Sequence, residues 1–198
     1  LNAARSMVDH EVPLIGVNLG RLGFLADISP ADLISHLGEI LSGRYIVEER
    51  ILLYSTIVRN GEIISKNNAF NDVVLHKNEV GRMIEVEIRV NGKFINNRRS
   101  DGLIVSTPTG STAYALSGGG PLMYPSLHAV VIVPICPHTL SYRPIVMGME
   151  ADTEIEIILH DENSGGAQVT CDGQIKITLE ASDRIIIKRK DKSIRLIH

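Results

Sequence analysis

The spacing of apolar and polar positions changes near residue 44, from mixed helix and strand patterns to strand patterns alone. Residues 1–8 are compatible with a helix, and residues 12–17 form a short apolar run typical of a buried parallel strand. A glycine-rich loop is expected at 18–23. This order is typical of an α/β arrangement, and we interpret residues 1–43 as part of such a domain.

The clearest helix signal lies between Ser29 and Gly43. Ser29 suits the N-cap, Pro30 suits the first helical position, and Asp32 suits the first turn. Gly43 is expected to end the helix. The apolar stripe of this helix comprises Leu33, Ile34, Leu37, Ile40 and Leu41.

After residue 44 the apolar positions follow the period of strands. Residues 51–58 lead into Asn60-Gly61, and the alternating residues 84–90 lead into Asn91-Gly92; both dipeptides are strong signals for a two-residue hairpin. Many short strands with regular turns predict an all-β sandwich over 44–198. Further strands are predicted at 73–76, 103–106, 129–133, 154–160, 168–171 and 185–188.

Composition is that of an ordinary soluble protein of 198 residues, with 44% hydrophobic and 22% charged residues. The net charge is −3 and no basic stripe occurs, which argues against a nucleic-acid partner. No apolar run approaches the ~18 residues of a membrane span. Cys136 and Cys171 belong to no metal or redox motif, so we expect free thiols, no metal site and a cytoplasmic protein.

The segment 101–121, DGLIVSTPTGSTAYALSGGGP, carries the most chemical information. It predicts a strand, a turn, and a short helix capped by Ser111 or Thr112 that ends near Gly118. Backbone N–H groups and hydroxyls at such a turn can hold phosphate or sugar oxygens. By composition alone, a Ser/Thr/Gly turn of this kind is more often purely structural. The sequence contains neither a P-loop nor a Gly-x-Ser-x-Gly motif.

Residues 107–114, TPTGSTAY, match the signature of NAD kinases. Four further segments resemble that family in the family's order: 18–27, FNDVV at 70–74, GGGP at 118–121, and PICPHTLSYRP at 134–144. The resemblance covers essentially the whole chain. It implies the C-terminal part of an α/β nucleotide-binding domain (1–43) followed by a β-sandwich dinucleotide-binding domain (44–198).

Two departures from the family pattern concern the first domain. Leu19 stands where many bacterial members carry arginine. The family's Gly-Gly-Asp-Gly segment, which supplies the catalytic aspartate, does not occur among the 198 residues and is expected just before Leu1. We therefore expect no catalytic residue and no metal ligand within this sequence.

The resemblance implies phosphoryl transfer from ATP, with Mg²⁺, to the 2′-hydroxyl of the adenosine ribose of NAD, giving NADP. It implies a homodimer or homotetramer, in which Arg99 or Asp101 completes a neighbour's site. Polyphosphate as an alternative donor and NADH as an alternative acceptor remain open. Two other interpretations also remain open: a lipid kinase of the diacylglycerol or sphingosine type, and a non-catalytic dinucleotide-binding module.

The family's ligand positions can be assigned residue by residue. Asn71 and Asp72 are expected on ribose hydroxyls or the adenine edge, Arg99 on the pyrophosphate, and Tyr114 as a stacking face. Without the resemblance, Asn71 and Asp72 would be interpreted as a turn and Arg99 as a solvated edge. The predicted NAD-binding residues are Asn71, Asp72, Arg82, Arg99, Asp101, Thr109, Thr112, Ala113, Tyr114, Ala115, Leu116, Ser117, Cys136 and Gln174.

Overall fold

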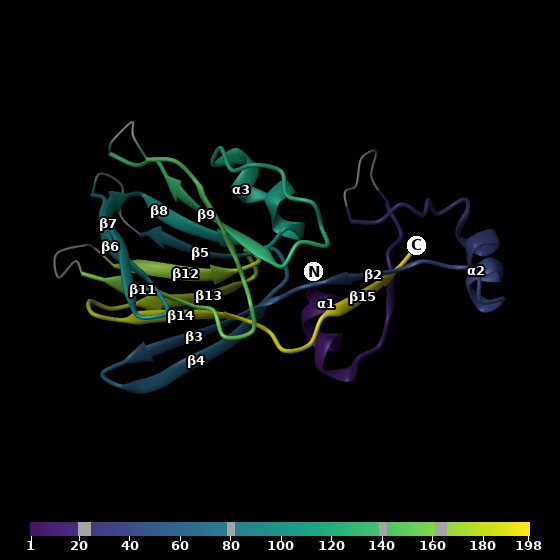
Figure 1. Ribbon diagram of the computed structural model, residues 1–198, viewed down its shortest axis with the longest axis horizontal. Coiled ribbons are helices and arrows are strands. Elements are labelled where there is room, and N and C mark those ends of the chain that lie inside the picture. The colour runs from purple at the N-terminus through teal and green to yellow at the C-terminus, as the bar shows by residue number, and fades with distance from the viewer. Residues whose placement is uncertain (20–24, 79–81, 139–141, 161–165) are drawn as a thin grey trace.

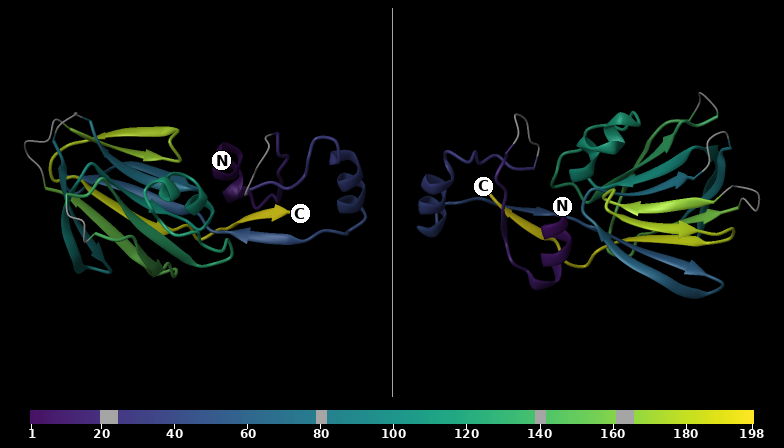
Figure 2. Two further views of the ribbon diagram at one scale, coloured as in Figure 1. Left: turned by 90° about the horizontal axis from the view of Figure 1, so that it is seen from above. Right: turned by 180° about the vertical axis from the view of Figure 1, so that it is seen from behind.

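Two six-stranded antiparallel sheets packed face to face make up most of the molecule (Figure 1). The computed structural model describes residues 1–19, 25–78, 82–138, 142–160 and 166–198. A smaller part, built of a three-stranded sheet and two helices, extends from one end of the sandwich in both views of Figure 2. The predicted β-sandwich is therefore confirmed.

The first sheet of the sandwich carries the candidate site, and its strands are antiparallel throughout. Their order across the sheet is β10-β9-β8-β5-β12-β13. The strands are β5 (Asp72–Lys77), β8 (Gly102–Ser106), β9 (Ala129–Ile135), β10 (Ile145–Gly148), β12 (Ala167–Cys171) and β13 (Ile175–Leu179).

The second sheet has the order β4-β3-β14-β11-β6-β7. Asn60-Gly61 joins β3 to β4 and Asn91-Gly92 joins β6 to β7, with positive φ at all four residues. Both hairpins predicted from these dipeptides are thus confirmed. The strands are β3 (Leu53–Arg59), β4 (Glu62–Ala69), β6 (Ile84–Val90), β7 (Lys93–Ser100), β11 (Glu154–Leu159) and β14 (Arg184–Arg189).

The main core lies between the two sheets because each strand directs alternate apolar side chains inward. Val73 and Leu75 of β5 belong to this core, together with Leu53 and Ile57 of β3. Val74, between them in sequence, points to the other face of the first sheet and belongs to a separate cluster. Strand β5 is consequently buried on both faces.

The smaller part begins with α1 (Asn2–Met7) and the 3₁₀ turn η1 (Val8–His10). Strand β15 (Ile194–Ile197), near the C-terminus, lies between β1 (Leu14–Ile15) and β2 (Val47–Arg50), parallel to β1 and antiparallel to β2. The sequence pattern did not predict β15. The division of the chain after residue 43 stays a prediction, and strands from both sides of it share this small sheet.

The helix expected after Ser29 is present as α2 (Leu33–Leu41), and Gly43 follows it with φ +84°. Ser29 is not its N-cap: Asp32 is, and the Ser29 hydroxyl donates to the Asp32 carboxylate at 2.7 Å. None of the helix residues is buried against the described residues, and Ile34 and Leu41 are mostly exposed. The apolar stripe predicted the helix but not a contact surface within the described chain.

Candidate functional site

A cavity of about 310 Å³ opens on the outer face of the first sheet. It lies where the N-terminal end of β5 meets the turn between β12 and β13. Its walls come from three segments far apart in sequence. The lining residues are Asn71, Asp72, Val74, His76, Ala113, Tyr114, Thr170, Asp172 and Gly173.

The floor of the cavity follows from the alternation of strand β5. Asp72, Val74 and His76 are two residues apart and share the outer face of the strand. Thr170 of β12 pairs in register with Val74 and lies on the same face. The sheet therefore presents one carboxyl, one imidazole and one hydroxyl around an apolar centre.

One wall is formed by the segment that contains the TPTGSTAY motif, folded as the 3₁₀ turn η2 (Thr109–Thr112) and the short helix α3 (Tyr114–Ser117). Ala115 is fully buried against Val74 and Ile104, which anchors this segment on the sheet. The rings of Tyr114 and His76 stack with centroids 5.8 Å apart and planes inclined by 23°. Burial also lowers the pKa of His76, which favours its neutral form.

The hydroxyls of this motif do not cap α3, contrary to the sequence prediction. Ser111 donates to the carbonyl of Pro108 at 2.7 Å, and Thr112 donates to the carbonyl of Thr109 at 3.2 Å. Helix α3 begins after Ala113 without a side-chain cap. The hydroxyls are used within the turn because η2 and α3 are two short elements rather than one continuous helix.

The motif is fixed directly against Asn71. The Thr107 amide donates to the Asn71 carbonyl at 2.8 Å, and the Thr107 hydroxyl donates to the Phe70 carbonyl at 2.7 Å. A Cβ on Gly110 would lie 2.2 Å from the Asn71 carbonyl oxygen, so only glycine allows this approach. The two motif segments thus form one rigid unit.

A single carboxylate holds the segment that carries Asn71 and Asp72. Asp172 accepts hydrogen bonds from the backbone N–H groups of Phe70 (3.0 Å), Asn71 (2.7 Å) and Asp72 (3.2 Å). Arg5 of α1 donates to the same carboxylate at 2.6 Å. Asp172 and Gly173 both have positive φ, which turns the β12–β13 hairpin toward the cavity.

The side chains of Asn71 and Asp72 remain available to a ligand. Among the residues that the structure describes, neither side chain has a hydrogen-bond partner, although Asp72 is only 4% exposed. Burial, and secondarily the charge of Asp172, raises the pKa of Asp72 to about 7. An incompletely paired carboxyl at the edge of a cavity is a typical binding group.

The predicted ligand residues fall into two groups. Asn71, Asp72, Ala113 and Tyr114 line the cavity. Thr112 directly precedes Ala113, Leu116 and Ser117 belong to α3 together with Tyr114, and Gln174 directly follows the lining residue Gly173. Thr109 and Ala115 are buried: the Thr109 hydroxyl accepts from Arg50 at 3.2 Å, and the Ala115 side chain faces the core.

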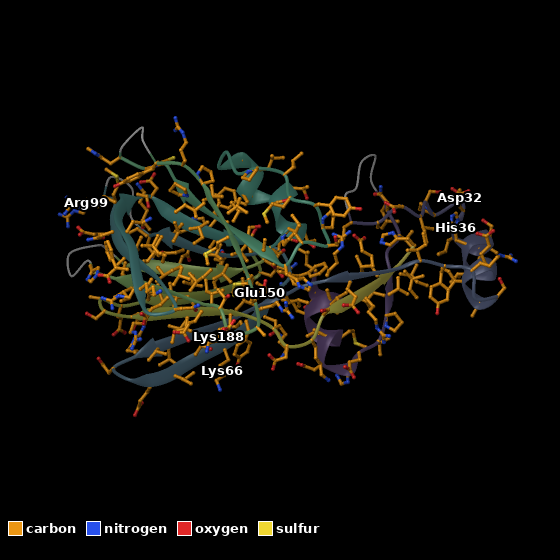
Figure 3. All side chains as sticks on the ribbon, viewed as in Figure 1. Asp32, His36, Lys66, Arg99, Glu150 and Lys188 are labelled. Atoms are coloured by element: carbon orange, nitrogen blue, oxygen red, sulfur yellow. The ribbon has the colours of Figure 1, made fainter. Side chains whose placement is uncertain are left out.

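The second group comprises Arg82, Arg99, Asp101 and Cys136, of which Figure 3 labels Arg99 at the end of the sandwich farthest from the smaller part of the molecule. Arg99 pairs with Glu85 at 2.9 Å, and Asp101 pairs with Lys77 at 2.5 Å. Cys136 directly follows Ile135, whose carbonyl accepts from the Asp101 amide. Arg82 lies two residues before Ile84, the first residue of β6, which pairs in register with Ser100. These four residues do not join the cavity within one chain.

Sequence reasoning missed three residues that shape the cavity, namely Arg5, His76 and Asp172. His76 could have been found, because its spacing of four from Asp72 on a strand places both on one face. The contact between Arg5 and Asp172 spans 167 positions and has no local signal.

Two further observations, on membrane spans and on metal ligands, apply to the residues that the structure describes. None of their helices is long and apolar enough to cross a membrane. Their His, Cys, Asp and Glu side chains form no cluster of three or more that could hold a metal ion.

Comparison with known proteins defines the class. Residues 1–45 match the ATP-NAD kinase N-terminal domain, and residues 70–198 match the ATP-NAD kinase C-terminal domain. The chain therefore belongs to the NAD kinase family, which decides against the lipid kinase interpretation.

The curated relatives carry the same name over the whole length of the chain. The NAD kinase of Teredinibacter turnerae is 52% identical over 198 residues, which are 100% of this chain and 67% of that protein. The NAD kinase of Hahella chejuensis is 50% identical over 100% of this chain and 66% of its own length. This chain thus spans about two thirds of these relatives.

Two solved structures share the fold. Yeast NADH kinase complexed with NADH superposes with a TM-score of 0.85 at 28% identity, covering 94% of this chain and 55% of that one. An NAD kinase from Archaeoglobus fulgidus in complex with ATP gives 0.76 at 29% identity, covering 93% and 68%.

Proposed function

We propose that this chain forms the acceptor-binding part of an NAD kinase, which transfers a phosphoryl group from ATP to the 2′-hydroxyl of the adenosine ribose of NAD. One observation carries the proposal. The cavity combines Asn71 and Asp72 with Ala113 and Tyr114, from two of the motif segments that resemble the family. The complexes of the relatives, one with NADH and one with ATP, agree with a dinucleotide acceptor and an ATP donor.

The available side chains suit the polar parts of a dinucleotide. The Asn71 amide offers donors and an acceptor, and the ionised Asp72 carboxylate accepts from two hydroxyls. The stacked rings of Tyr114 and His76 present a flat apolar surface beside these groups. We assign these residues to binding and orienting NAD, which is a large part of catalysis in phosphoryl transfer.

Mg²⁺ would neutralise charge on the transferred phosphoryl group. No residue described here is assigned to holding it, and none is assigned as the catalytic base.

We also propose that Arg82, Arg99, Asp101 and Cys136 belong to the site of a neighbouring subunit in a homodimer or homotetramer. Arg99 lies at the end of the sandwich farthest from the smaller part of the molecule (Figure 3), and none of the four residues lines the cavity of its own chain. Arg99 keeps a largely exposed guanidinium despite its pairing with Glu85. An exposed arginine can donate hydrogen bonds to the pyrophosphate of a dinucleotide that is bound to a neighbouring subunit.

Isothermal titration calorimetry with NAD tests the binding role. Asn71→Ala should weaken NAD binding by about 1–3 kcal/mol, roughly 5- to 150-fold, because polar ligand atoms lose their partner. Asp72→Ala should have a similar effect. Asn67→Ala is the control, because its amide donates to Ser65 on the second sheet and does not line the cavity. Wild-type affinity in both Asn71→Ala and Asp72→Ala would refute the assignment.

A further inference from the structure

Arg5 of α1 makes a forked contact with two residues of the β12–β13 hairpin. Its Nη1 donates to the Asp172 carboxylate at 2.6 Å, and its Nη2 donates to the side-chain oxygen of Gln174 at 2.5 Å. The Arg5 side chain is 8% exposed and that of Asp172 is fully buried. The pair is therefore shielded from competing water, and its geometry is constrained.

The Asp172 end of this fork controls the backbone beneath the ligand. Three consecutive N–H groups, from Phe70 to Asp72, converge on the Asp172 carboxylate. The Asp172 amide donates back to the Asp72 carbonyl at 3.0 Å. With the backbone satisfied in this way, the side chains of Asn71 and Asp72 are left to face the cavity.

The Gln174 end of the fork determines how that side chain is presented. Arginine carries only donors, so it engages the amide oxygen of Gln174 and not the nitrogen. The amide nitrogen, which carries two donors, is left free of Arg5. Gln174 follows Gly173 at the rim of the cavity, where an acceptor atom of a bound dinucleotide would meet this group.

We propose that Arg5 is a positioning residue for the dinucleotide: it neutralises the carboxylate that holds Asn71 and Asp72, and it orients Gln174 as a hydrogen-bond donor. The inference rests on the proposed function. It adds to that function an oriented donor for a ring nitrogen, sugar oxygen or phosphate oxygen of NAD. It also makes α1, which contributes no lining residue, part of the acceptor site.

The conservative substitution Arg5→Lys distinguishes the contact of Arg5 with Asp172 from its contact with Gln174. The lysine of Arg5→Lys is a single point charge, so it can remain paired with Asp172 but cannot span both partners in a planar fork. The experiment titrates NAD into the complete chain and into Arg5→Lys, Gln174→Ala and the double variant. Arg5→Lys should weaken binding about 2- to 12-fold in the wild-type background, the worth of one hydrogen bond. In the Gln174→Ala background the same substitution should have no further effect.

Arg59 supplies a matched control, because it also pairs with a fully buried aspartate, Asp183, and with a glutamate. Arg59→Lys should lower the unfolding temperature as much as Arg5→Lys does, with unchanged NAD affinity. A loss of affinity in Arg5→Lys that is the same with and without Gln174 would overturn the proposal. So would an unchanged affinity in Arg5→Lys.

The side-chain amide signal of Gln174 in a ¹⁵N NMR spectrum gives a readout that needs no ligand. It is identified by its loss in Gln174→Ala. In the wild type it should differ from the free-amide position, and in Arg5→Lys it should move to that position. The wild-type signal could be displaced from the free-amide position while the wild-type chain fails to bind NAD. That result would refute the proposed function, and with it the ligand role of Gln174. A signal at the free-amide position in the wild type would refute the fork itself.

Discussion

Replacing Asp72 by asparagine should make the protein more stable at alkaline pH while weakening its proposed ligand site. Asp72 is 4% exposed, and burial together with the charge of Asp172 raises its pKa to about 7. Its carboxyl has no hydrogen-bond partner among the described residues. Ionising this group in the folded protein is therefore costly, whereas in the unfolded chain it is not.

The sign and size of the effect follow from linkage. The pKa of Asp72 is higher in the folded protein than in the unfolded chain, where it is about 3.9. The stability that the protonated carboxyl contributes is therefore fully present below about pH 3.9 and is lost as the pH rises through about 7. Between pH 5 and pH 8 the wild type should lose about 3 kcal/mol from this group alone. The side chain of Asp72→Asn does not titrate and should not lose it.

The assay is urea unfolding of both proteins at pH 5 and pH 8 without ligand. The free energy of unfolding of Asp72→Asn should gain about 3 kcal/mol relative to the wild type between these two pH values. The other titrating groups contribute equally to the pH dependence of the free energy of unfolding in both proteins, so their contributions cancel in the difference. An equal pH dependence in the two proteins would refute the argument, because Asp72 would then ionise as easily in the folded state as in the unfolded one.

Three further predictions concern other parts of the molecule. Arg99→Ala should weaken NAD binding in the oligomer while leaving the free energy of unfolding almost unchanged, since its ion pair is exposed; a chain that light scattering shows to be monomeric, yet binds NAD fully, would contradict the shared site. A thiol reagent should label the exposed Cys136 at once, and NAD should slow this reaction in the oligomer, whereas Cys171, whose pKa burial raises to about 12, should react only after unfolding; mass spectrometry counts the labels. Gly110→Ala should cost more than about 2 kcal/mol of stability through the clash with the Asn71 carbonyl, whereas Gly38→Ala, with nothing within 4 Å on α2, should raise stability by up to about 1 kcal/mol in the same urea assay.

Local chemistry made the sandwich and half of the candidate site predictable. Asn60-Gly61 and Asn91-Gly92 define two hairpins because only certain residues accept positive φ at both turn positions. The alternation of residues 84–90 correctly predicted a strand with one buried face. The TPTGSTAY segment was correctly interpreted as a turn and a short helix, although its hydroxyls bond within the turn.

Contacts between distant segments were not predictable in the same way. Asp172 looks like an ordinary turn residue until the fold brings it under the amides of Phe70–Asp72. Nothing near Arg5 in sequence indicates its two partners on the β12–β13 hairpin. The separation of Arg99 from the cavity is equally a property of strand order, because β7 lies at the edge of the second sheet.

The position of β15 has a consequence for how the chain is made. Leu14 of β1 pairs with Leu196 of β15, about 180 residues later in the chain. At a synthesis rate of about 5–20 residues per second, β15 is made roughly 10–40 seconds after β1 and roughly 7–30 seconds after β2. During that time both strands expose unpaired edges, which invite pairing with other nascent chains. The β3–β4 and β6–β7 hairpins can form much earlier, but β14, which lies between β3 and β11, is made only shortly before β15. The second sheet and the small sheet are therefore both completed late, and both depend on protection during synthesis.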